Sequence, residues 1–432
     1  MKILILCGVA EKETQQEVIA HSRGGADIAA NLFQQKLIAG FRSLDTDCEV
    51  LSAPFLGAYP MRCDLMRFRG FQREDPGCTY VKFNNIWGLR NFSRASALKK
   101  ALKDFIASDD PKKLILVYCP HTPFLEAATF AKKKDPAIRV CMYVPDLPNY
   151  MNLNANRTWF YDVAKKVDIR RMTKLMDCVD SYVLLTEYMK DHLPVGNKPY
   201  RVAEGIIEKF PELPKPTVSG PEKYVVYTGK MFERFGVKAL IDGFLSLQNP
   251  DYRLVLCGKG DCEAYARSAQ VKDPRIMFLG QVTPEEAISW QSRASALVNP
   301  RNVVEEYTRY SFPSKNIEYL LSGKPVVGYF LDGMPPVYQD FLCCIDPALP
   351  AQEGIAAKLD EVLRSDANVL FEKNKRFFEY ARQPLVAEGI AQSIIDLTML
   401  VRGILWFTYG LRWRFYSPSL VLKTNTYSAR HK

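Results

Sequence analysis

Several patterns that would indicate other classes of protein are missing from this chain of 432 residues. Its four histidines are scattered, and its eleven cysteines include no Cys-x-x-Cys pair, so no metal-ligand spacing and no redox motif is present. An odd, scattered set of thiols is typical of a reducing compartment, which predicts a cytoplasmic protein. No Gly-x-Gly-x-x-Gly follows the first apolar run, residues 2–6, which argues against a dehydrogenase.

Long hydrophobic runs are also missing. No stretch reaches the roughly eighteen apolar residues that a membrane-spanning helix needs. The apolar run at the N-terminus is too short for the core of a signal peptide and is better explained as a buried parallel strand. No recognisable nucleic-acid-binding module is present, and no Asp-x-Asp is placed to hold a metal ion. We therefore expect no nucleic-acid partner, no cofactor and no obligatory metal.

The charge that is present is basic and uneven, with a formal net charge of +10. Arginine and lysine alternate with aromatic residues between residues 61 and 103. The final segment, from Arg402, carries six Arg or Lys, several aromatic residues and no Asp or Glu. Basic residues beside Trp and Tyr suit a lipid headgroup region, so we expect peripheral contact with the inner face of the cell membrane. The alternative is that the tail packs onto the first domain.

Short apolar runs alternate with helical patterns along most of the chain, which predicts an α/β fold with mostly parallel strands. A helix is expected at residues 26–41. The expected strands are residues 2–6, 114–118, 140–144 and 182–185, then 224–227, 253–257, 276–279, 296–299 and 325–329. Between the two groups, residues 208–222 contain four prolines. We predict a first Rossmann-like domain at 1–207, a linker at 208–222, a second Rossmann-like domain at 223–380, and a C-terminal helix and tail at 381–432.

Two loops of the second unit contain glycines at the ends of expected strands. Gly229 is followed by Lys230 and Arg234, which lie just before an expected helix. The N–H groups and the dipole of a helix N-terminus favour anions, so this loop is a candidate diphosphate site. The alternative is an ordinary solvated turn. Gly258 begins a Gly-x-Gly at the next strand end, where the backbone can approach a ligand closely.

The most informative segment runs from Asn299 to Val327. Arg301 follows the expected strand 296–299. The segment then contains Tyr310, Ser311, Ser314, Lys315 and Glu318 before Gly323. Ser314 is expected as the N-cap of a short helix, and Gly323 as its end. Glu318 lies about one turn into that helix, so its carboxylate can accept hydrogen bonds from a vicinal diol.

This segment resembles the donor-site signature of family 4 glycosyltransferases, the group 1 set with the GT-B fold, especially members that build bacterial surface polysaccharides. The resemblance covers residues 224–346 well and the first domain only in general layout. It implies a retaining transferase, and it implies that Glu318 binds the nucleotide ribose. The family's first glutamate falls at Tyr310, and its diphosphate-binding cations fall at Lys230 and Phe235. Glu305 or Glu306 is a candidate replacement for the missing glutamate. Arg234 is a candidate replacement for the cation that is missing at Phe235.

In the first domain, Gly24 and Gly25 resemble the family's glycine-rich loop, which closes over the donor and approaches the acceptor. His121 and Asp146 each follow an expected strand and are the candidate catalytic residues on the acceptor side. The expected function is transfer of a sugar from a nucleotide-diphosphate sugar to a glycan or lipid-linked glycan. A non-catalytic sugar-nucleotide or glycan-binding module and a nucleotide-sugar epimerase of the same architecture are the alternatives.

Overall fold

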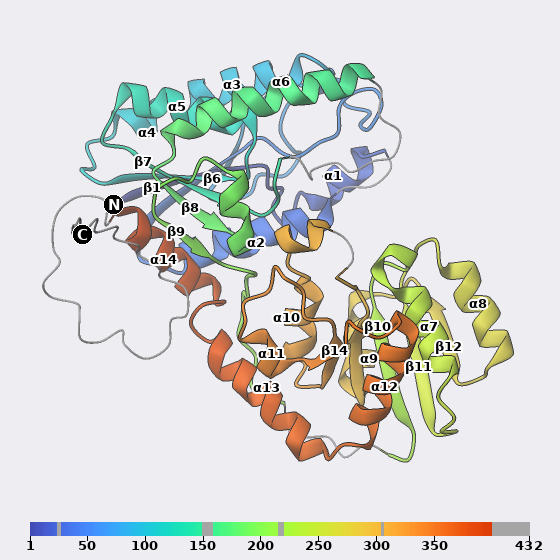
Figure 1. Ribbon diagram of the computed structural model, residues 1–432. Coiled ribbons are helices and arrows are strands. Elements are labelled where there is room, and N and C mark those ends of the chain that lie inside the picture. The colour runs from blue at the N-terminus through green and yellow to red at the C-terminus, as the bar shows by residue number, and fades with distance from the viewer. Residues whose placement is uncertain (24–26, 149–158, 215–219, 304–305, 400–432) are drawn as a thin grey trace, which may run out of the picture.

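The computed structural model describes residues 1–23, 27–148, 159–214, 220–303 and 306–399. These residues form two parallel sheets, each flanked by helices (Figure 1). The first sheet has the order β4-β2-β1-β6-β7-β8-β9. Its strands are β1 (Lys2–Cys7), β2 (Asp47–Ser52), β4 (Cys78–Tyr80), β6 (Lys113–Tyr118), β7 (Arg139–Val144), β8 (Ser181–Leu184) and β9 (Tyr200–Val202).

Helices cover both faces of this first sheet, which explains why its central strands are apolar throughout. All six residues of β6 are buried, as expected for a parallel strand between two helical layers. In α2, Leu37 and Phe41 are buried against the sheet. The helices are α1 (Gln15–His21), α2 (Ile28–Arg42), α3 (Arg90–Ala101), α4 (Lys103–Ala107), α5 (Thr122–Lys134) and α6 (Trp159–Leu175), with short 3₁₀ turns η1 (Met176–Cys178) and η2 (Glu187–His192). A small antiparallel ribbon joins β3 (Arg67–Phe68) to β5 (Phe83–Asn84).

The second sheet has the order β12-β11-β10-β13-β14-β15. Its strands are β10 (Lys223–Thr228), β11 (Tyr252–Cys257), β12 (Ile276–Gly280), β13 (Ala296–Asn299), β14 (Val326–Gly328) and β15 (Cys343–Cys344). Its helices are α7 (Val237–Leu245), α8 (Glu263–Lys272), α9 (Pro284–Arg293), α10 (Ser314–Leu321), α11 (Tyr338–Phe341), α12 (Ala351–Arg364) and α13 (Ala367–Ala381), with 3₁₀ turns η3 (Glu233–Phe235) and η4 (Glu306–Tyr310). The order reverses between β10 and β13, and such a switch point is where ligands bind in doubly wound sheets.

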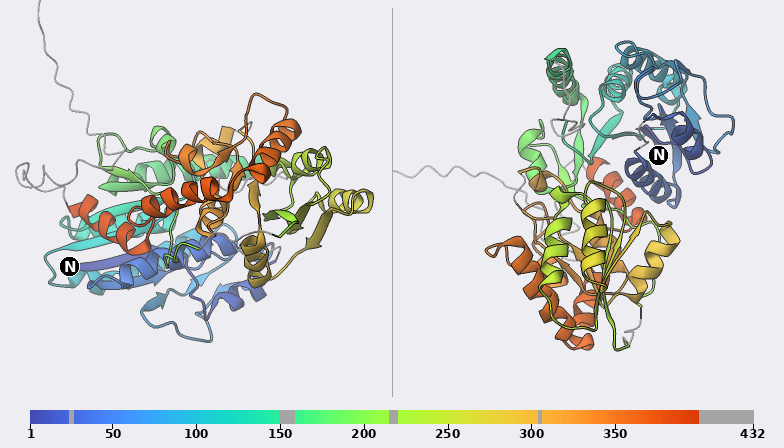
Figure 2. Two further views of the ribbon diagram at one scale, coloured as in Figure 1. Left: turned by 90° about the horizontal axis from the view of Figure 1, so that it is seen from below. Right: turned by 90° about the vertical axis from the view of Figure 1, so that its right-hand side faces the viewer.

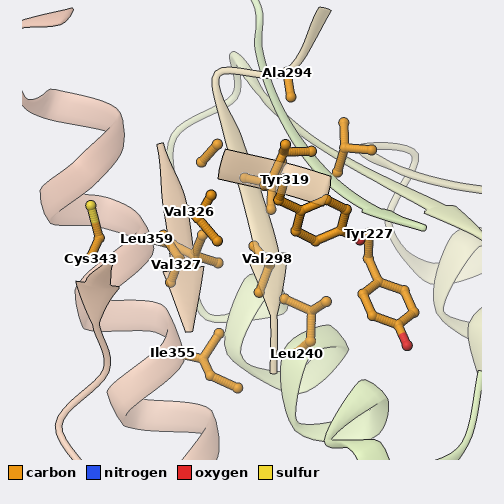
Figure 3. Packing of buried hydrophobic residues seen from close by; sticks show 14 of the residues in the cluster. Tyr227, Leu240, Ala294, Val298, Tyr319, Val326, Val327, Cys343, Ile355 and Leu359 are labelled. Atoms are coloured by element: carbon orange, nitrogen blue, oxygen red, sulfur yellow. The ribbon is translucent and has the colours of Figure 1, made fainter. Parts of the chain in front are cut away.

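The core of the second domain is continuous across its sheet. Figure 3 shows Leu240 of α7 and Ile355 of α12 pointing toward Val298 of β13, while Tyr319 of α10 lies above the same strands. Tyr319 is fully buried, and its hydroxyl accepts from Thr228 N at 2.9 Å. This contact fixes α10 against the end of β10.

The last described helix, α14 (Ala387–Met399), leaves the second domain and packs on the first, beside α2 (Figures 1 and 2). Gly40 of α2 allows the close approach, because a Cβ at that position would lie 2.2 Å from the carbonyl oxygen of Ala387. The hydroxyls of Ser181 and Thr398 are 2.7 Å apart. The C-terminal helix therefore belongs to the packing of the first domain, while the basic-aromatic tail lies outside the described residues.

The chain passes between the two domains twice, near Ile207 and near Leu385, and backbone hydrogen bonds join these two segments. Ile207 N donates to Leu385 O at 2.7 Å, and Ala387 N donates to Ile207 O at 2.9 Å. Beside them, the buried carboxylate of Glu204 accepts from the hydroxyls of Tyr338 and Tyr380 at 3.2 and 2.9 Å. Burial raises the pKa of Glu204 above its ordinary value. These contacts join the two crossing segments to each other and to α11 and α13 of the second domain.

Candidate active site

The two glycine loops of the second domain lie against each other at the carboxyl ends of β10 and β11. Gly229 N donates to Cys257 O at 2.9 Å, and Met231 N donates to Lys259 O at 3.0 Å. Gly258 has φ +144°, and a Cβ there would lie 1.7 Å from Gly229 O. Only glycine permits this approach, so the two loops form one surface. Lys230 is exposed on it.

Helix α10 brings Glu318 to the same loop surface through a chain of side-chain hydrogen bonds. Gln291 of α9 donates to Thr228 Oγ1 at 2.9 Å and to Glu318 Oε1 at 2.7 Å. Lys315 Nζ lies 3.0 and 3.1 Å from the two carboxylate oxygens of Glu318. Glu318 remains solvent-exposed. The carboxylate is thus positioned next to the Gly229 loop while its accepting capacity remains open to a ligand.

Helix α10 begins at Ser314, so the predicted N-cap role of this serine is wrong. The cap position is Pro313, and no side chain caps the helix. Ser314 is exposed at the first helical position. Gly323 follows the helix with φ +71°, as predicted for the residue that ends it. In the first turn of α10, Asn316 N donates to Pro313 O at 2.8 Å, and among the described residues no side chain accepts from the N–H groups at the start of the helix.

Arg301 and Arg234 form a second cationic group at the end of β13. Arg301 donates to Ser311 Oγ at 2.9 Å and stacks over the Tyr307 ring at 4.8 Å. The guanidinium carbons of Arg301 and Arg234 lie 5.8 and 5.1 Å from the centroid of Phe235. A cavity of about 380 Å³ lies between the starts of α7 and α12, and Arg234 and Asn302 line it. Glu318 is not among the residues that line this cavity.

Comparisons with known proteins address the fold of the chain and the class of its second domain. Residues 222–365, about a third of the chain, match the family model described as Glycosyl transferases group 1. A structure of sucrose-phosphate synthase from Thermosynechococcus elongatus is similar over 93% of this chain and 99% of that chain, with TM-score 0.60 and 14% identity. The lipopolysaccharide outer core galactosyltransferase WaaB is similar over 93% and 99%, with TM-score 0.57 and 14% identity. HepE from Anabaena, in complex with UDP and glucose, is similar over 93% and 100%, with TM-score 0.55 and 11% identity. None of the curated proteins matches the sequence.

The chain contains, at residues 222–365, a domain that is similar to those of group 1 glycosyltransferases. It is a glycosyltransferase with the GT-B fold, which confirms the fold and the enzyme class predicted from the sequence. The matched domain of this glycosyltransferase begins just before β10 and ends just after α12. It therefore contains both glycine loops and all of α10.

Tyr310, which stands where the family has its first glutamate, contacts the other domain. Its hydroxyl lies 2.8 Å from His192 Nε2 of η2, and the two ring centroids are 4.6 Å apart. Tyr310 is 8% exposed and packs in the hydrophobic cluster of the first domain. Thr186 Oγ1 donates to the neighbouring Arg309 O at 2.8 Å. The glycosyltransferase thus uses this position in its domain interface, and the expected donor contact of Tyr310 stays a prediction.

Asp146 lies at the carboxyl edge of the first sheet, just beyond β7. Its side chain is exposed, yet the protein atoms packed around it, and secondarily the charge of Asp27, raise the pKa of Asp146 from 3.8 to about 6. Asp27 is the N-cap of α2 and accepts from Ala30 N at 3.2 Å. The carboxyl group is therefore ionised at neutral pH and keeps its proton in mild acid.

His121 occupies the corresponding edge position after β6, where it is much more enclosed. Its ring contacts Phe55 and Phe124, with centroid distances of 5.6 and 4.6 Å. The Nδ1 atom is buried and has no hydrogen-bond partner among the described residues. Burial, together with the charges of Arg94 and Arg90, holds the pKa of His121 well below its ordinary value. The imidazole is neutral at physiological pH.

The candidate residues fall into separate groups in the structure. Gly24, Gly25 and Glu305 lie outside the described residues, and the side chain of Glu306 is not described. Among the rest, the structure brings Gly229, Gly258, Lys315 and Glu318 together in the second domain. Arg301, Ser311 and Arg234 form a neighbouring group at the end of β13, and His121 and Asp146 lie on the edge of the first sheet.

Sequence reasoning missed two residues that organise the site. Gln291 is 3% exposed and joins Thr228 to Glu318, although it lies in an otherwise ordinary amphipathic helix. His192 holds Tyr310 across the domain interface from 118 positions away in the sequence. The role of Gln291 could have been suspected from a glutamine on the buried face of a helix. The sequence around His192 gives no indication of its contact with Tyr310.

Proposed function

We propose that the enzyme transfers a sugar from a nucleotide-diphosphate sugar to a glycan or lipid-linked glycan acceptor, with retention at the anomeric carbon, in surface polysaccharide biosynthesis. The observation that carries the proposal is the placement of Glu318, through Gln291 and Thr228, beside the loops of Gly229 and Gly258. This arrangement offers a carboxylate for a ribose diol next to backbone and lysine groups suited to a diphosphate. The similar protein HepE has been solved in complex with UDP and glucose.

The proposed donor contacts divide into two groups. Glu318 accepts from the ribose hydroxyls, while Lys230, Lys315 and the uncapped start of α10 bind the diphosphate. Lys315 now pairs with Glu318 at 3.0 Å, so a diphosphate would give it a second anionic partner. Positive groups that are already in place stabilise the negative charge that develops on the leaving diphosphate. Arg301, Ser311 and Arg234 are a second set of candidates for the same charge.

The proposed chemistry needs no dedicated nucleophile. The bond between the anomeric carbon and the diphosphate oxygen breaks, and the acceptor oxygen bonds to the same face of that carbon. The acceptor proton passes to the departing diphosphate oxygen. Asp146 orients the acceptor hydroxyl from the first domain, and its pKa of about 6 leaves it charged at neutral pH for this purpose. His121 is the second catalytic candidate on that side.

A panel of nucleotide sugars incubated with the purified full chain, with and without glycan acceptors, tests this function. The proposal expects acceptor-dependent release of nucleoside diphosphate and a product whose anomeric configuration equals that of the donor. Donor binding without turnover by any acceptor would favour the non-catalytic module. Conversion of one nucleotide sugar to another without acceptor would favour the epimerase, and an inverted product would contradict retention.

We further propose that the enzyme works in the cytoplasm at the inner face of the membrane. Supporting this, large apolar side chains are exposed within the basic stretch 61–103: Met61, Met66, Trp87, Leu89 and Phe92. Such side chains among arginines suit binding to an anionic bilayer surface. Flotation with anionic vesicles should carry the full chain and should weaken after truncation at Gly403. Failure of the full chain to float would contradict the proposal.

No described helix is both long and apolar enough to span a bilayer.

A further inference from the structure

The last residue of β10, Thr228, is held by hydrogen bonds at its backbone and at its side chain. Tyr319 Oη accepts from Thr228 N at 2.9 Å and donates to Thr228 O at 3.0 Å. Thr228 Oγ1 lies 3.2 Å from the same phenol oxygen and accepts from Gln291 Nε2 at 2.9 Å. Thr228, Gln291 and Tyr319 are all buried. We refer to these three residues as the polar triplet.

The direction of each hydrogen bond in the polar triplet follows from the number of protons that each group carries. The phenol of Tyr319 keeps its proton, because burial raises its pKa above the ordinary value, and it has only this one to donate. A carbonyl oxygen can only accept, so this proton points to Thr228 O. The hydroxyl proton of Thr228 therefore points to Tyr319 Oη, and Thr228 Oγ1 accepts from the side-chain amide of Gln291.

The same count fixes the orientation of the Gln291 amide. The amide nitrogen carries two protons, and the amide oxygen carries none. One proton points to Thr228 Oγ1 at 2.9 Å, and the other points to Glu318 Oε1 at 2.7 Å. The reversed amide would place an acceptor oxygen against a carboxylate oxygen, which is also an acceptor. Thr228 thus helps to determine which atom of Gln291 faces Glu318.

The two carboxylate oxygens of Glu318 have different surroundings. Oε1 accepts from Gln291 Nε2 and from Lys315 Nζ, whereas Oε2, among the described residues, accepts only from Lys315 Nζ. Gln291 is fixed in the protein interior, while the side chain of Lys315 is partly exposed. Oε1 is therefore the anchored oxygen, and Oε2 is the one more open to a ribose hydroxyl. A side chain that is already oriented binds a ligand without the entropic cost of being ordered.

We propose that Gln291 and Thr228 are positioning residues that orient the Glu318 carboxylate toward the ribose diol, and that they thereby set a preference for ribonucleotide donors over deoxyribonucleotide donors. This inference rests on the proposed function, which it deepens by naming residues that determine donor selectivity. Both residues act through Glu318 and do not touch the donor. Without the hydroxyl of Thr228, the Gln291 amide loses one acceptor and can turn away from Glu318, and the carboxylate then samples other orientations.

The test compares the affinity of the full-length protein for a ribonucleoside diphosphate with its affinity for the 2′,3′-dideoxy form of the same nucleotide. Titration calorimetry with UDP, GDP, ADP and CDP first identifies the ribonucleotide that binds most tightly, and its dideoxy form is then titrated. The ratio of the two dissociation constants is the ribose preference. It should be about tenfold or more in the wild type, because a hydrogen bond to a charged group contributes at least that much.

Thr228→Val removes the hydroxyl and nearly keeps the shape of the side chain. The ribose preference should fall about threefold or more, as the net contribution of one hydrogen bond implies, and Thr228→Ser should restore it. Gln291→Met, of similar length, should lower the preference at least as much. The matched control is Thr398→Val, because Thr398 is a fully buried threonine on α14 whose hydroxyl also forms hydrogen bonds. The control should keep the ribose preference of the wild type.

A purely structural role of the two residues predicts a different result, in which both nucleotides weaken by the same factor and the ribose preference does not change. An unchanged preference in Thr228→Val, or in Gln291→Met where urea denaturation shows Thr228→Val to be unfolded, would overturn the inference while the donor assignment stands. An equal fall in Thr398→Val would also overturn it. A wild-type preference near one would refute the inference together with the ribose assignment of Glu318. If none of the four diphosphates binds the wild type, the proposed function itself has failed.

Discussion

Replacing Glu318 by glutamine tests the donor site with little change of shape. The substitution keeps one acceptor oxygen and removes the negative charge and the second acceptor. Gln291 and Lys315, which lie 2.7 and 3.0 Å from Glu318 Oε1, lose a charged partner. A hydrogen bond to a charged group is worth about 1.5–3 kcal/mol, so loss of one ribose contact predicts about 10- to 150-fold weaker donor binding.

The stability of the variant should hardly change. Glu318 is solvent-exposed, and its pair with Lys315 is an i,i+3 contact on the helix surface. Exposed pairs of this kind contribute about 0–1 kcal/mol. The matched control is Glu361→Gln, because Lys358 and Glu361 form an i,i+3 pair with the same order of charges, at 2.6 Å, on α12. The control should keep full donor affinity.

Isothermal titration calorimetry with the nucleoside diphosphate and with the corresponding nucleoside measures the effect. Both ligands contain the ribose, so both should bind more weakly to Glu318→Gln by a similar factor. Unchanged affinity of both ligands would refute the ribose assignment. Equal weakening in Glu361→Gln would show that the loss arises from removal of a helix ion pair in general and not from loss of the ribose contact.

Four further predictions address the remaining parts of the site. Lys230→Ala should weaken nucleoside diphosphate binding far more than nucleoside binding, because its exposed ammonium is assigned to the diphosphate; equal weakening would show that assignment to be wrong. Transfer activity should persist in EDTA, and complete loss restored by magnesium or manganese would contradict metal-independent catalysis. Tyr310→Phe removes the hydrogen bond to His192 and should lower the free energy of unfolding by about 0.5–1.5 kcal/mol, measured by urea denaturation; no change would mean that this bond does not stabilise the domain interface. The pKa of Asp146 is about 6 in the folded state against an ordinary 3.8, so its contribution to stability is present below pH 3.8 and is lost as the pH rises through 6. Asp146→Asn should therefore be more stable than the wild type at pH 7.5 and equally stable at pH 3.5. A gain in stability of the same size at both pH values would contradict the raised pKa.

The regular parts of both sheets could be predicted because buried parallel strands are apolar on both faces. The nine strands expected from the sequence all occur, with ends that differ by at most one residue. Strands β2, β4, β9 and β15 of the two sheets were not predicted. Strands β2 and β4 are partly exposed, with sequences DCEVLS and CTY that lack a continuous apolar run, and β9 and β15 have only three and two residues.

The donor site could be outlined from its local motif, whereas the contacts between domains could not. Gly229, Gly258 and Glu318 are recognisable because each lies near the end of a strand or the start of a helix. The contact of Tyr310 with His192 depends on how the two domains pack, and no pattern near either residue encodes it. The same holds for α14, which the sequence shows as a helix but not as a part of the first domain's packing.

The most direct test of the central claim is acceptor-dependent turnover of a nucleotide sugar by the full-length enzyme. Turnover is measured as the release of nucleoside diphosphate, and the glycoside product is analysed for its anomeric configuration. The account predicts that at least one nucleotide sugar is consumed with retention and that Glu318→Gln loses most of this activity while Glu361→Gln keeps it. A chain that binds no nucleoside diphosphate and transfers no sugar, or a Glu318→Gln variant as active as the wild type, would contradict the account.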